Sequence, residues 1–127
     1  MLVDSIEQPN GIAIFPNGKT IIVSNSDEVK KRWYLYDIAS NGSLSNARVF
    51  YDVSDEKGLG GCDGLKIDDK GNVFASGPGG IWIFTKNGKL IGIIKLNGVP
   101  ASNCALTADG KTIFITTSKY VLRVKMR

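Results

Sequence analysis

The sequence predicts an all-β chain made of about three units, each a four-stranded antiparallel sheet. One observation is that a polar residue precedes the same strand–turn–strand pattern three times, at Asn10, Asp63 and Asn103. Another is that the chain holds 15 glycines, several in Asn-Gly and Asp-Gly pairs that favour tight hairpins over helices. A repeat of roughly 40 to 50 residues is typical of β-propeller blades. The expected fold is therefore half of a six-bladed β-propeller.

Unit one is expected over residues 8–53, and it alternates apolar runs with turn signals. Its strands are predicted at residues 11–15, 20–26, 32–38 and 47–53. Asn17-Gly18 provides the first hairpin turn, because glycine readily takes the positive φ that such turns need. A charged loop follows the second strand, and a polar turn over residues 39–46 leads to the fourth.

Unit two is expected over residues 62–96, as a meander with short hairpins. Its strands are predicted at residues 64–68, 72–77, 80–85 and 90–96. Unit three, over residues 101–127, shows only three strands, at 104–108, 112–118 and 120–125. Residues 2–6 belong to no hairpin of unit one, so they would supply an outer strand to a unit three. The whole chain, residues 1–127, is expected to form a single half-propeller domain.

Three blades do not close a ring, because propellers typically have about four to eight. Two copies related by a twofold axis would give six blades, and a twofold pair is the commonest oligomer. Homodimerisation is therefore the expected route to closure. The alternative is that the chain is half of a longer protein and that a separate partner chain supplies the other blades.

The composition excludes several classes of function. The net charge is +4, but the basic residues are scattered, so no nucleic-acid surface is expected. No apolar run is long enough to span a bilayer, and no secretory signal is visible at the start of the chain, which favours a cytoplasmic setting. The chain has no histidine, which excludes Ser-His-Asp catalysis. Cys62 and Cys104 lack zinc-type spacing, and reduced thiols are favoured over a disulfide.

The repeated polar residues are the predicted site. Blades begin at the central channel, so Asn10, Asp63 and Asn103 would converge there and hold a divalent cation through oxygen atoms. Calcium is the expected ion, with zinc or magnesium as alternatives. Asp63 would also be the catalytic base, and Asn25, at the end of the second strand, would contact substrate. The competing interpretation is that such residues only bond their own backbone in turns.

The motifs resemble the SMP-30/gluconolactonase/luciferin-regenerating family. They are carried by residues 8–13, 18–26, 61–68, 71–84 and 103–105. The resemblance implies the C-terminal half of a six-bladed propeller and metal-dependent hydrolysis of sugar lactones and related esters. In that family a Glu, an Asn and an Asp hold the ion, and by motif Asn10 and Asp63 match the Asn and the Asp. The Glu belongs to the other half of the ring, as do the Arg and the Asn that contact sugar hydroxyls.

Three functions follow from these observations. The first is a lactone hydrolase that acts as a dimer on a small lactone or ester, without nucleic acid or membrane. The second is a non-catalytic half-propeller that binds a ligand or a partner. The third is the remnant of a split lactonase that is stable only with its other half.

Overall fold

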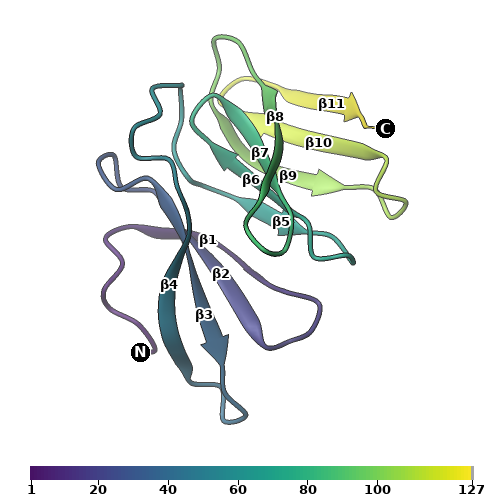
Figure 1. Cartoon of the computed structure of the whole chain (residues 1–127). Helices are drawn as coiled ribbons and strands as arrows, with labels where there is room; N and C mark the ends of the chain where they lie inside the picture. The colour runs from purple at the N-terminus through teal and green to yellow at the C-terminus, as the bar shows by residue number, and fades with distance from the viewer. Residues whose placement is uncertain (127) are drawn as a thin grey trace.

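The computed structural model describes residues 1–126, which form three antiparallel sheets and no helix (Figure 1). Sheet one contains β1 (Pro9–Ile14), β2 (Thr20–Asn25), β3 (Arg32–Ile38) and β4 (Leu44–Asp52). Sheet two contains β5 (Leu65–Ile67), β6 (Val73–Gly77), β7 (Gly80–Phe84) and β8 (Leu90–Lys95). Sheet three contains β9 (Ala101–Leu106), β10 (Thr112–Thr117) and β11 (Val121–Lys125). No helix in this part of the chain could therefore cross a membrane.

In each sheet the strands follow the order of the chain, so every neighbour is joined by a hairpin. Glycine closes the first hairpin of sheets one and three. Gly18 and Gly110 have φ values of 71° and 68°. Each donates its N–H at 2.9 Å to the carbonyl oxygen of the residue that follows the preceding strand, Phe15 or Thr107. A residue with a Cβ would be strained in this conformation. The Asn-Gly and Asp-Gly pairs therefore set the spacing of the strands, as the sequence predicted.

The first strands of the three sheets lie side by side. β1 contacts β5, and β5 contacts β9. The residues that open these strands therefore gather on one side of the molecule, while the later strands of each sheet lie further out. This arrangement positions the candidate site.

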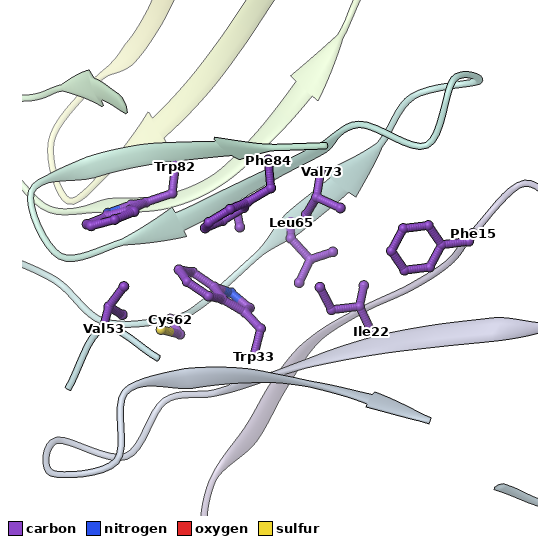
Figure 2. Packing of buried hydrophobic residues seen from close by; sticks show 10 residues of the cluster. Phe15, Ile22, Trp33, Val53, Cys62, Leu65, Val73, Trp82 and Phe84 are labelled. Carbon is purple, nitrogen blue, oxygen red and sulfur yellow. The ribbon is translucent and has the colours of Figure 1, made fainter. Parts of the chain in front are cut away.

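Large aromatic side chains fill the space between sheets one and two (Figure 2). Trp33 of β3 is fully buried and meets Phe84 of β7 edge-on, with ring centroids 5.3 Å apart. Ile22 of β2 packs into the same cluster, whereas its neighbour Ile21 faces the opposite side of the sheet. The period of two along the strand thus directs alternate residues into this core. Burial of such a ring stabilises the fold by about 1.5–3 kcal/mol.

Sheets two and three pack through a second, largely aliphatic core. Phe74 and Ile81 of sheet two meet Cys104, Ile113 and Ile115 of sheet three. The alternation of Ile113 and Ile115 with polar or exposed residues in β10 explains why only one face of this strand is buried. Sheet two is therefore covered on both faces.

Sheets one and three each keep one outer face without a sheet against it. On sheet one, Ile12 and Ile14 are 63% and 56% exposed. On sheet three, Phe114 and Val121 are 40% and 72% exposed. These apolar side chains lie where the next blade of a ring would pack.

Several strand limits differ from the prediction. β4 begins at Leu44 rather than at residue 47, because the turn closes within five residues through Ala39 N–H donating to Ser43 O at 2.9 Å. Asn46, with φ of 54°, then forms an irregular point inside the strand. Residues 2–6 form no strand in the single chain, and Val3 and Ile6 instead pack on the outer face of sheet one.

The two cysteines are free and buried, as predicted. Burial raises the pKa of the Cys62 thiol to about 12 and that of Cys104 to about 11. Both thiols are therefore protonated and poorly nucleophilic at neutral pH.

Candidate functional site

Asp63 lies two residues before β5 and contacts sheets one and two. Its side chain is half-buried, whereas Asn10 in β1 and Asn103 in β9 are exposed. Asn10 and Asn103 lie in the first strands of sheets one and three, and Asp63 lies just before the first strand of sheet two. The structure nevertheless gives each of them a different environment.

The main chain of Asp63 is held by hydroxyl groups from two sheets. Ser24 of β2 donates to the carbonyl oxygen of Asp63 at 2.7 Å. Ser76 of β6 accepts from the Asp63 N–H at 3.1 Å. Both serines are fully buried, so water does not compete for these bonds. The peptide groups on either side of the carboxylate are therefore fixed in place.

Residue 11 is a glycine, and the absence of a Cβ there lets sheet one approach Asp63 closely. Gly11 donates its N–H to Ser24 Oγ at 2.6 Å. A Cβ on Gly11 would lie 3.0 Å from Ser24 Oγ and 3.1 Å from the carbonyl carbon of Asp63, and far too close to the carbonyl oxygen. The residue after Asn10 must therefore be glycine for Asn10 to reach the neighbourhood of Asp63.

A glycine also allows a close approach between sheets two and three. A Cβ on Gly64 would overlap the side-chain amide of Asn103. Gly64 also donates its N–H to Ser102 O at 2.8 Å. Each glycine that follows a repeated polar residue thus makes room for the next unit.

Burial raises the pKa of Asp63 above its usual range, and interaction with the side chain of Asn10 opposes this shift. A carboxylate with a raised pKa is a stronger base, and it also gains more from a nearby cation than a fully solvated one does. The side chains of Asn10 and Asp63 therefore interact.

Asn103 is shifted by one residue from the register of the other two. The first hairpins of the three sheets are closed by equivalent bonds from the N–H groups of Phe15, Asp68 and Thr107. Measured back from these residues, Ser102 rather than Asn103 is equivalent to Asn10 and Asp63. The simple repeat had placed all three polar residues in register, but Asn103 lies seven residues before its turn glycine Gly110, whereas Asn10 lies eight residues before Gly18.

The amide oxygen of Asn103 is already engaged. It accepts from Lys66 Nζ at 3.2 Å and from Cys104 N–H at 2.9 Å. The ammonium of Lys66 thus lies beside the oxygen that would bind a cation. Asn103 can serve as a ligand only if Lys66 turns away.

Asn25 makes no exposed surface for a substrate. It is fully buried, and its side chain accepts from Gln8 N–H at 2.9 Å and donates to Lys30 O at 2.9 Å and to Glu7 Oε2 at 3.0 Å. The amide group of Asn25 is therefore used by hydrogen bonds to Glu7 and Gln8, which precede sheet one, and to Lys30, which precedes β3. The expected substrate contact is therefore not proposed further, and Asn25 instead positions Glu7 and Gln8 ahead of Asn10.

Glu7 is the nearest additional carboxylate in the sequence, and it too is engaged. It forms an ion pair with Lys30 in addition to its bond with Asn25. These contacts lower its pKa. Among residues 1–126, no group of three His, Cys, Asp or Glu side chains gathers closely enough to hold a metal ion. In one copy of the chain, Asp63 and Asn10 are the predicted site residues whose side chains interact.

Sequence reasoning did not identify the roles of Ser24 and Ser76. A signal was present, since each occupies the penultimate position of the second strand of its sheet. It also missed Lys66, whose role depends on a contact between two units. A cleft of about 820 Å³ lies elsewhere, between the hairpin turns at Asp69 and Asp109, and includes none of the predicted ligands.

Comparison with known proteins gives a consistent assignment. The family model for the SMP-30/gluconolactonase/LRE-like region matches residues 1–119. A gluconolactonase from Zymomonas mobilis is 41% identical over 127 residues, covering 96% of this chain and 36% of that protein.

Solved structures show the same fold. A gluconolactonase from Xanthomonas campestris superposes with a TM-score of 0.85 at 28% identity, over 99% of this chain and 40% of that one. Regucalcin from Agrobacterium tumefaciens, a calcium-binding protein, has a TM-score of 0.75 at 24% identity, over 93% of this chain and 40% of that one. The chain thus has the fold of half a propeller and spans about two fifths of the length of these relatives. It belongs to the SMP-30/gluconolactonase/LRE-like family.

Proposed function

We propose that the chain forms the Asp63-bearing half of a divalent-metal-dependent hydrolase of sugar lactones or related esters. The observation that carries the proposal is the placement of Asp63. Its main chain is fixed by Ser24 and Ser76, its carboxylate is half-buried with a raised pKa, and Asn10 lies beside it. The names of the gluconolactonase relatives supply the substrate class.

Asp63 would act as the general base. It accepts a proton from the water that adds to the lactone carbonyl. The bond between the carbonyl carbon and the ring oxygen then breaks, and the proton passes to that oxygen, so one hydroxy acid is formed. The rigid backbone keeps the carboxylate in one position during these steps, which reduces the entropic cost of reaction.

Asp63 and Asn10 would hold the cation, since both offer hard oxygen atoms of the kind that calcium prefers. Zinc or magnesium is the alternative, and Asn103 would be a further ligand once Lys66 turns away. When bound, a divalent cation polarises a carbonyl and stabilises the negative charge that develops on its oxygen. Burial of the Asp63 carboxylate fits this role, because a cation offsets the desolvation of the charge.

A second copy of the chain would complete the ring. The outer faces of sheets one and three expose Ile12, Ile14, Phe114 and Val121, and exposed apolar patches of this kind mark interaction sites. A twofold pair sets sheet one of each copy against sheet three of the other. The six sheets then surround one axis, and both copies of Asn10 and Asp63 line the same channel.

The test is hydrolysis of gluconolactone measured by titration of the acid released, above the spontaneous rate, with and without calcium. Asp63→Asn removes the charge and should lower the calcium-dependent rate by about 100-fold or more. Asp69→Asn is the matched control, because Asp69 is an exposed carboxylate at the first turn of the same sheet. Full activity in Asp63→Asn would show that the proposed base is wrong.

The alternative is a half-propeller that binds a ligand without turning it over. It is favoured by one observation, that the amide oxygen of Asn103 already accepts a hydrogen bond from Lys66 Nζ at 3.2 Å. Calcium binding by calorimetry without hydrolysis of a lactone panel would support it. Activity that appears only after addition of a separate N-terminal half from a relative would instead identify the remnant of a split lactonase.

The cysteines Cys62 and Cys104 are free thiols, which fits the predicted cytoplasmic setting.

A further inference from the structure

We propose that residues 2–6 of one copy pair with the free edge of β11 in a second copy and complete its sheet three. This inference rests on the ring closure proposed above and adds an exchanged strand to it. Sheets one and two have four strands each, whereas the described part of sheet three has β9, β10 and β11. Among residues 1–126, no strand pairs with the outer edge of β11.

The backbone of β11 shows which groups form this edge. Met126 donates its N–H to Lys111 O at 2.7 Å, on the side of β10. Successive residues of a strand direct their peptide groups to opposite sides. The N–H groups of Leu122 and Val124 therefore point toward β10, and those of Val121, Arg123 and Lys125 point to the free edge.

Part of the space beside this edge is lined by apolar side chains, and charged residues such as Asp69 and Asp109 line the rest. The cleft of about 820 Å³ between sheets two and three is lined in part by Ile91 and Ile94 of β8 and by Val124 and Met126 at the end of sheet three. In sheet two, the fourth strand β8 fills the corresponding place, where Leu90 and Ile93 pack into the core shared with sheet one. A fourth strand on β11 would cover Ile91, which is 58% exposed in the single chain.

Residues 2–6 have the length, the position and the charge for this pairing. They match the five residues of β11 and make no strand of their own. Val3 and Ile6 already lie on the outer face of sheet one, against Ile21, Val23 and Tyr36. Ring closure brings sheet three of the second copy to this same face.

Charge favours the same partner. Arg123 lies opposite Phe114 in the register of β10 and β11, and Lys125 lies opposite Thr112. Both basic residues are exposed and share the outer face of sheet three with Phe114. The donated segment contains Asp4. An acidic segment placed against a basic strand edge aids correct docking.

The experiment compares the dimer dissociation constants of three variants of the 127-residue chain with that of the wild type by sedimentation. Arg123→Pro removes an edge N–H, and Pro is tolerated where the N–H faces outward. Arg123→Ala keeps the N–H and is the control. The third variant replaces residues 2–6 with alternating Gly and Ser. We expect Arg123→Pro and the replaced segment to weaken the dimer at least tenfold, and Arg123→Ala to weaken it less.

A second measurement needs no variant. The amides of Arg123 and Lys125 should exchange with deuterium at least tenfold more slowly at concentrations where the dimer forms than in the monomer. A wild-type chain that stays monomeric would overturn ring closure and the exchanged strand together. A dimer that is equally tight in all variants, with fast exchange at these amides, would overturn the exchanged strand and leave ring closure standing.

Discussion

Replacing Gly11 with alanine tests whether the close approach of sheet one to Asp63 holds the site together. The added methyl group meets backbone, because a Cβ there would overlap the carbonyl oxygen of Asp63 and lie 3.1 Å from its carbonyl carbon. A side chain could rotate away from such a clash, but this carbonyl is bonded to Ser24 at 2.7 Å. The two sheets must therefore separate.

The expected loss of stability follows from these contacts. Overpacking of this kind costs about 1–3 kcal/mol. Separation also weakens the bond of Ser24 to Asp63 O, worth about 0.5–1.5 kcal/mol. The total loss is about 1.5–4.5 kcal/mol in the free energy of unfolding, and for a chain of this length the melting temperature should fall by about 6–18 °C.

Circular dichroism during heating and in urea measures both quantities. Gly92→Ala is the matched control, because Gly92 lies in β8 and a Cβ there meets no atom within 4 Å. That variant should stay within about 1 kcal/mol of the wild type. A Gly11→Ala chain as stable as the Gly92→Ala chain would refute the proposed contact between the sheets.

Three further predictions concern the surroundings of the site. Ser76→Ala should lower the free energy of unfolding by about 1–3 kcal/mol, because it leaves the N–H of Asp63 without its hydrogen-bond partner. Urea unfolding measures this loss, and no change would show that the hydroxyl is dispensable. Asn25→Ala should lower the free energy of unfolding by about 2–4 kcal/mol, since it leaves Gln8 N–H and Lys30 O unpaired. Protease cleavage near residue 8 should also become faster, and unchanged cleavage would contradict the anchoring role of Asn25. Burial raises the pKa of Asp63, so its protonated form is favoured by folding and the stability it gives is lost as the pH rises through that raised pKa. In metal-free buffer Asp63→Asn should therefore melt near the wild type at pH 4 and above it at pH 7, and a lower melting temperature at pH 7 would contradict this sign.

The repeats allowed most of the fold to be predicted from the sequence. Asn17-Gly18 and Asp109-Gly110 occur at the turns where the structure places positive φ at glycine. The limits of β4 were harder to predict, because the strand begins within a polar segment and accommodates Asn46 as an irregular residue. Polar residues at an exposed sheet edge leave little apolar alternation to detect.

The site was predicted only in part. Asn10 and Asp63 could be found because each precedes a Gly in the same motif. The shift of Asn103 was missed although the sequence shows it, since Asn103 lies seven residues before Gly110 and Asn10 lies eight before Gly18. The burial of Asn25 could not be found, because its partners Gln8 and Lys30 lie outside its own strand. Such contacts arise from the packing of distant segments and have no local signal.

The serine bonds to residue 63 end on its backbone and leave its side chain unbound by them. Ser24 and Ser76 contact the carbonyl and the N–H, which every amino acid except proline possesses. The position can therefore change its chemical group while the frame around it stays the same. Evolution of new chemistry at this point needs one codon to change, and the scaffold that aims the side chain is inherited intact.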